Sequence, residues 1–148
     1  MIVQTFYIKK YGWRVRVFYA VSHYHVGRIV DALREIGCRG RRLRSARESL
    51  IRAEIDTGLT YSNYLRRETV MVIGMASTAA EYENSIRHEA HHLHMHIAEA
   101  CGLDPYGEPV AYLVGETSRA MHPVASRLTC ECCQKEVRDG FCGKMHFF

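Results

Sequence analysis

The chain has 148 residues, of which 47% are hydrophobic and 24% are charged, and its formal net charge is +4. This length suits one domain with its own hydrophobic core, and this composition excludes wholesale disorder. No run reaches the roughly 18 consecutive apolar residues that a membrane-spanning helix needs, and the N-terminal residues lack the apolar stretch of a signal peptide. We therefore expect a cytoplasmic protein with no membrane partner.

The N-terminal segment predicts a β-hairpin. Residues 3–8 are rich in β-branched and aromatic side chains, and residues 9–12, Lys-Lys-Tyr-Gly, supply a turn. The return strand alternates, with four apolar side chains on one face: Trp13, Val15, Val17 and Tyr19.

Two helices are expected next. Apolar residues at helical spacing predict the first over residues 24–36, and the second should span residues 45–55 with Ser45 as its N-cap. An arginine-rich segment from Arg39 to Arg47 joins them. Such a run can bind nucleic-acid phosphates or an acidic partner, and it can equally be a solvated surface.

The second half of the chain begins with turn-forming residues at 59–69. Residues 69–74 then predict a strand that is buried on both faces. Thr78 and Glu81 have the spacing of a capping box, which predicts a helix that continues up to Gly102.

A last helix is predicted over residues 107–121, closed by Pro123. The tail that follows is rich in cysteine and glycine. We therefore expect one folded domain at residues 1–125 and a Cys-rich tail at residues 126–148.

The chemistry is indicated by residues 88–92, His-Glu-Ala-His-His, which match the H-E-x-x-H pattern. His88 and His92 lie one helical turn apart, so both imidazoles can bind one metal ion, and Glu89 lies beside them as a base for a water molecule. The apolar residues of this helix form a stripe on another face: Ile86, Ala90, Leu93, Ile97 and Cys101. The pattern predicts a Zn²⁺-dependent metallopeptidase with Glu89 as general base.

Catalytic zinc normally has a third protein ligand and one position left for water. Position 98 is alanine, which excludes the class of zinc peptidases with a histidine six residues after His92. A carboxylate from the last helix is the remaining option. Glu108 shares a helix face with Gly115, where the two helices can approach closely, whereas Glu116 lies about 80° away. Glu108 is therefore favoured, with Glu116 as the alternative.

Other polar side chains near the motif are harder to assign. The group that stabilises the oxyanion is left open among four side chains: Tyr106, Tyr112, His96 and His122. His91 and His94 are expected on the flanks of the helix, exposed to solvent.

The tail has the ligand types and tight spacing of a small zinc knuckle. Its candidate ligands are Cys130, Cys133, Cys142 and His146. Cys132 offers a fifth ligand, and a weakly ordered tail with incidental thiols is the alternative interpretation.

Residues 60–116 resemble the minigluzincins, small zinc peptidases, and similar metallopeptidases of bacteria and their phages. Four segments carry the resemblance: Thr60-Tyr61-Ser62-Asn63, Val70-Met71-Val72-Ile73-Gly74, the H-E-x-x-H motif, and Gly107-Glu108-Pro109-Val110-Ala111-Tyr112-Leu113-Val114-Gly115.

This resemblance implies an α+β fold, with a small mixed β-sheet packed on helices and a cleft beneath its edge strand. It implies His88, His92 and Glu108 as zinc ligands, and a peptide substrate extended beside residues 70–74. Thermolysin-type relatives carry Asn and Asp where this chain has Gly107 and Tyr112. The groups around the ligands must therefore differ from theirs.

Two other classes of function are left open. One is a nucleic-acid-binding or partner-binding module that uses the arginine-rich segment and a tail held by zinc, with a structural zinc ion in the centre. The other is a zinc hydrolase of non-peptide bonds, because a fold does not determine the substrate.

Overall fold

The computed structural model describes residues 1–52 and 57–130. Within them the chain forms a mixed four-stranded sheet with helices on both faces, so the predicted α+β fold is confirmed. The elements are β1 (Ile2–Ile8), β2 (Trp13–Val21), α1 (Val26–Glu35), α2 (Gly40–Ile51), β3 (Gly58–Asn63), β4 (Glu68–Gly74), α3 (Ala79–Cys101) and α4 (Glu108–Thr129). In this part of the chain, no helix combines the length and the apolar character needed to cross a bilayer.

The strands lie in the order β1-β2-β4-β3. The N-terminal hairpin is confirmed as the antiparallel β1–β2 pair, while β2 and β4 are parallel and β3 and β4 are antiparallel. Because β4 has a partner on each side, the prediction that a substrate strand pairs beside residues 70–74 is wrong. The free edge near α3 belongs to β3, which lies where turn formers had predicted a loop.

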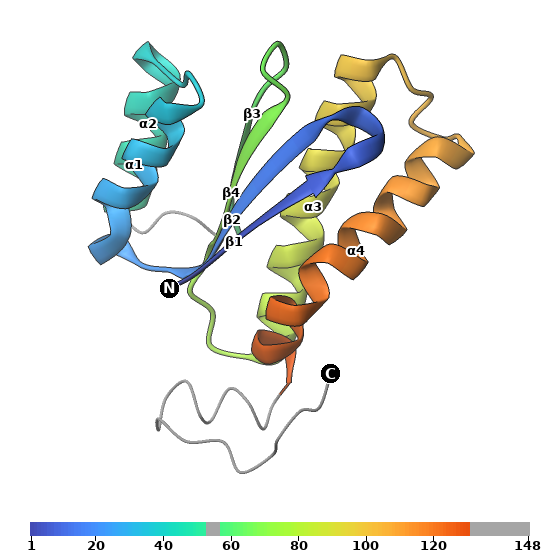
Figure 1. Cartoon of the computed structure of the whole chain (residues 1–148). Coiled ribbons are helices and arrows are strands. Elements are labelled where there is room, and N and C mark those ends of the chain that lie inside the picture. The colour runs from blue at the N-terminus through green and yellow to red at the C-terminus, as the bar shows by residue number, and fades with distance from the viewer. Residues whose placement is uncertain (53–56, 131–148) are drawn as a thin grey trace.

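Helices α3 and α4 cover one face of the sheet, and α1 and α2 cover the other (Figure 1). The first core contains the predicted apolar face of β2, namely Trp13, Val15, Val17 and Tyr19, packed with Leu93, Ile97, Leu113 and Met121 of the helices. The second core packs Phe18, Val70 and Val72 against Ile29, Leu33 and Leu50 of α1 and α2. Each face of the sheet therefore has its own apolar layer.

Two predicted helices have different bounds. Helix α2 begins at Gly40, with Arg39 rather than Ser45 as its N-cap. Helix α4 does not end before Pro123 but continues to Thr129, and its last turns pack Leu128 into the first core. Burial of this side chain offsets the hydrogen bond that a proline cannot donate inside a helix.

Candidate active site

The two histidines of the motif form the centre of the candidate site. Helix α3 begins where predicted, because the Thr78 side chain accepts a hydrogen bond from the backbone N–H of Glu81, and it ends at Gly102 in a left-handed conformation. Within it, His88 and His92 are both exposed, and their Nε2 atoms lie 3.2 Å apart. Both imidazoles thus present the same ring nitrogen to one point.

This separation fits a shared metal ion. Two nitrogen ligands at about 2.0–2.1 Å from a tetrahedral zinc ion lie about 3.3 Å from each other. The 3.2 Å between the Nε2 atoms of His88 and His92 is close to this value. The pair can therefore chelate zinc with little rearrangement of either side chain.

Glu89 lies under β3, on a face of the helix away from the apolar stripe, and it is only 2% exposed. Its Oε1 accepts a hydrogen bond of 2.8 Å from the hydroxyl of Thr57, and its Oε2 accepts one of 2.7 Å from Thr60. Each carboxylate oxygen retains a second lone pair. The two threonines satisfy this buried carboxylate and join β3 to the site helix.

Gly58 allows β3 to come this close to the site. It has a φ of 155°, and a Cβ placed on it would lie 1.8 Å from the backbone oxygen of Val72 and 3.2 Å from Cγ of Glu89. A larger residue would push β3 away from β4 and from the Glu89 side chain. The geometry of Glu89 thus depends on a glycine at this position.

A chain of hydrogen bonds ends at His96, one turn beyond His92. The indole of Trp13 donates to Oγ1 of Thr69, which lies 2.7 Å from Oγ of Ser62, and Ser62 lies 2.8 Å from Nδ1 of His96. An indole N–H can only donate. If each hydroxyl then donates onward once, Nδ1 of His96 accepts from Ser62 and Nε2 carries the proton.

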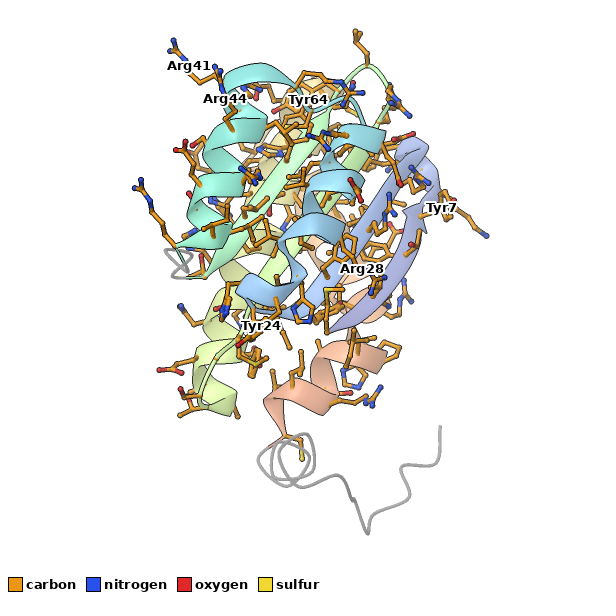
Figure 2. All side chains as sticks on the ribbon, turned by 90° about the vertical axis from the view of Figure 1, so that its left-hand side faces the viewer. Tyr7, Tyr24, Arg28, Arg41, Arg44 and Tyr64 are labelled. Carbon is orange, nitrogen blue, oxygen red and sulfur yellow. The ribbon has the colours of Figure 1, made fainter. Side chains whose placement is uncertain are left out.

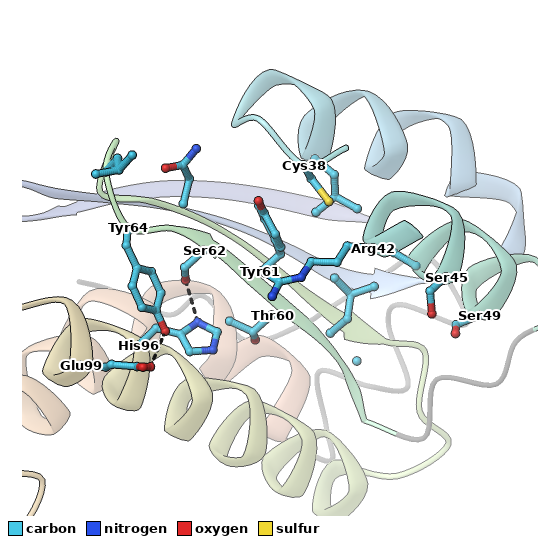
Figure 3. Close-up of a pocket in the computed structure, with 16 residues that line it drawn as sticks. Cys38, Arg42, Ser45, Ser49, Thr60, Tyr61, Ser62, Tyr64, His96 and Glu99 are labelled. Atoms are coloured by element: carbon cyan, nitrogen blue, oxygen red, sulfur yellow. Dashed lines mark hydrogen bonds between the residues drawn. The ribbon is translucent and has the colours of Figure 1, made fainter. Parts of the chain in front are cut away.

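His96 also lines a cavity of about 830 Å³ between α2, β3 and α3 (Figure 3). Burial lowers the pKa of His96, and the neighbouring His92 lowers it further against the opposing effect of Glu99. The ring is therefore neutral at neutral pH.

The other open candidates for oxyanion stabilisation lie on or beside α4 and are exposed: Tyr106, Tyr112 and His122.

The structure does not bring Glu108 to the histidine pair. Within residues 1–52 and 57–130, no three His, Cys, Asp or Glu side chains are grouped so that they could hold a metal ion. The start of α4 instead faces another side of α3, across a space of about 280 Å³ lined by His91, His94, Met95, Gly107, Val110, Ala111 and Val114. His91 and His94 lie about 100° and 160° around the helix from His92. Neither Glu108 nor the half-buried Glu116 joins the pair.

The flanking histidines differ from each other. His91 is exposed as predicted, whereas the prediction of an exposed His94 is wrong, because this side chain is 5% exposed. Nε2 of His94 has no hydrogen-bond partner among the described residues. Burial and, to a smaller extent, the nearby His91 lower the pKa of His94 to about 4.

The arginine-rich segment is divided between several roles. Arg39 donates hydrogen bonds to the backbone oxygens of Arg34 and Cys38, so it holds the end of α1. Arg41 and Arg44 project away from the molecule on α2 (Figure 2), whereas Arg42 lines the cavity. The segment is therefore not one continuous basic surface.

Three hydroxyl residues that position the site were missed in the sequence: Thr57, Thr60 and Ser62. Thr60 and Ser62 lie two residues apart on β3, so both face α3, where they contact Glu89 and His96. The alternation of hydroxyl residues from position 60 was a signal for a strand facing a polar helix surface.

In the tail, Cys133, Cys142 and His146 lie outside the described residues, so the proposed knuckle is not placed.

No family model, no curated protein and no solved structure matches this chain.

Proposed function

We propose that the chain is a zinc-dependent metallopeptidase in which His88 and His92 hold the metal ion. The observation that carries this proposal is the 3.2 Å separation of their Nε2 atoms on the exposed side of α3. Neutral imidazole nitrogens are preferred zinc ligands, and a catalytic site needs a position left open for water or substrate. The exposed pair supplies two such ligands and leaves the other positions of a tetrahedral ion open.

When bound, a zinc ion would supply Lewis-acid chemistry, which polarises a carbonyl group and acidifies water. Glu89 would accept the proton of the attacking water and pass it to the leaving amine, and Thr57 and Thr60 hold its carboxylate in place. The Nε2–H of His96 would donate to the oxyanion in the tautomer whose Nδ1 accepts a hydrogen bond from Ser62.

The free edge of β3 supports a peptide as substrate. Because β3 pairs with β4 alone among the described strands, its outer backbone groups can bind an extended chain that adds a further strand. The cavity is lined by residues from both faces of β3, as expected for a space that runs along the free edge of this strand. A peptide held there would pass beside the histidine face of α3.

The test uses full-length protein loaded with zinc and a library of quenched fluorescent peptides. We expect cleavage that a chelator abolishes and added zinc restores. Glu89→Gln should retain zinc and lose cleavage, because an amide cannot act as the base while it can still bond to the threonine hydroxyls. Cleavage by Glu89→Gln at the wild-type rate would refute the mechanism.

A second candidate function is supported by the outward arginines of α2. Arg41, Arg44 and Arg47 are exposed and form no ion pair with another described residue. Such a surface can bind nucleic-acid phosphates, with an affinity that falls steeply as salt increases. Salt-dependent binding of DNA or RNA that is unaffected by Glu89→Gln would favour this function over peptidase activity.

A further inference from the structure

The cavity that His96 lines, one helical turn from His92, has walls of different charge. Arg42, Ser45 and Ser49 line it from α2, while Glu99 lines it from α3, and the Tyr64 hydroxyl donates a 2.9 Å hydrogen bond to this glutamate. The α2 wall therefore carries a cation and hydroxyl groups. Among the described residues that line the cavity, the one carboxylate is that of Glu99, which lies on the opposite wall and already has a partner.

The Arg42 guanidinium is available to a ligand. It has neither an ion pair nor a hydrogen bond with any residue of the described ranges, unlike Arg16, which pairs with Glu35. Figure 3 shows its side chain extending from α2 into the cavity beside Tyr61. A cation in this position can pair with a carboxylate that enters the cavity.

The direction of β3 relative to α3 locates Arg42 along a bound peptide. Thr60 contacts Glu89, and Tyr64 contacts Glu99, so the two elements run in the same direction. Arg42 extends beside Tyr61 and lines the cavity together with Tyr64. These two tyrosines lie one and four residues beyond Thr60, so Arg42 lies roughly one to four residues from the position of Glu89 along β3. A peptide antiparallel to β3 would reach Arg42 before it reaches the scissile bond.

We propose that the cavity selects peptides that run antiparallel to β3 and carry an Asp or Glu side chain that pairs with Arg42, about one to four residues on the N-terminal side of the scissile bond. This inference rests on the proposed peptidase function and defines its substrate class. The hydroxyls of Ser45 and Ser49, on the same face of α2, are further donors to such a carboxylate. Tyr61 provides an apolar ring with a polar tip beside the ion pair.

The experiment compares matched peptides that differ by Glu or Gln at each position, using zinc-loaded full-length protein. One position should show a kcat/KM at least about 10-fold higher for Glu, because a hydrogen-bonded charge pair stabilises binding by about 1.5–3 kcal/mol. Arg42→Gln should abolish this preference, and Arg42→Glu should shift it toward Lys. Arg41→Gln, which alters an outward arginine of the same helix, should retain it.

A binding measurement separates failure of the inference from failure of the proposed function. The same peptides, labelled with a fluorophore, are titrated with the Glu89→Gln protein and followed by anisotropy. The Glu peptide should bind more tightly than the Gln peptide, and this difference should disappear in the double variant that carries both Arg42→Gln and Glu89→Gln. That result supports the subsite even if no peptide is cleaved. Equal binding of the Glu and Gln peptides, or a preference that persists without Arg42, would overturn it whatever the cleavage result.

Discussion

Thr60 donates a 2.7 Å hydrogen bond to Oε2 of Glu89, which joins the edge strand β3 to the helix that carries the histidine pair. Thr57 makes the corresponding bond to Oε1. The buried carboxylate is thereby held between two short side chains of a strand rather than by solvent. Strand position and the orientation of the candidate base are consequently linked.

Replacing Thr60 by valine should therefore affect both stability and activity. The loss of a hydrogen bond to a buried charged group should lower the free energy of unfolding by about 1.5–3 kcal/mol, and cleavage should fall because Glu89 is less well oriented. Urea denaturation measures the first effect. Thr5→Val, which alters an exposed threonine of β1, is the matched control. Equal stability of the two variants would contradict the role of Thr60.

Gly58→Ala tests the close approach of β3. The added methyl group would lie 1.8 Å from the Val72 backbone oxygen, so the strands must separate. We expect a loss of at least about 2 kcal/mol in the free energy of unfolding, together with lower cleavage. Gly27→Ala in α1, where nothing lies within 4 Å of the new Cβ, should be neutral or stabilising. A Gly58→Ala protein as stable as the Gly27→Ala protein would contradict the packing described.

His94 should make the metal-stripped protein sensitive to acid. Its pKa of about 4 in the folded state lies below the ordinary value of 6.5, so the unfolded state binds more protons between these values. Stability should fall as the pH drops below 6.5 and level off below about 4, with a total loss of up to about 3 kcal/mol. Thermal unfolding in the presence of a chelator measures this dependence. The His94→Leu variant should lose this dependence of stability on pH, whereas His122→Leu, which alters an exposed histidine, should retain it. A dependence that persists in His94→Leu would refute the assignment to His94.

His96 and Ser62 should affect cleavage unequally. If His96 donates to the oxyanion, His96→Ala should lower kcat by about 10²–10³-fold with little change in zinc content. Ser62→Ala removes only the bond that fixes the tautomer, so its effect should be smaller. Tyr112→Phe, on the exposed side of α4, serves as the control. Unchanged kcat in His96→Ala would exclude this residue from the reaction.

Glu108→Gln should leave zinc affinity within about twofold of the wild type, because the start of α4 faces His91 and His94 rather than the histidine pair. Glu116→Gln is measured in parallel, since this was the alternative ligand. Competition with a chromophoric chelator gives both affinities. A drop of 10-fold or more in Glu108→Gln would restore it as the third ligand.

The hairpin and the site helix were predictable from sequence because local rules determine them. The alternation from Trp13 to Tyr19 reflects one strand face that is fully buried, and Thr78 caps α3 as the spacing to Glu81 had indicated. Each of these two signals involves residues that lie only a few positions apart in the sequence. Tertiary contacts reinforced these local preferences rather than opposing them.

Strand β3 and the orientation of α4 were not predictable in the same way. β3 is half-buried and polar, and it is held by pairing with β4 and by side chains of α3 that lie about 30 residues away in the sequence. The sequence indicated which residues share a face of α4, but it did not indicate which of these faces packs against α3. That rotation decides whether Glu108 meets the histidine pair, and it depends on how the two helices pack.

Zinc titration of metal-stripped, full-length protein tests the central claim most directly. The account predicts that the wild type binds one more equivalent of zinc than either His88→Ala or His92→Ala. The His91→Ala variant, which changes an exposed histidine between the two ligands, should bind as the wild type does. Equal zinc stoichiometry and affinity in wild type, His88→Ala and His92→Ala would contradict the account.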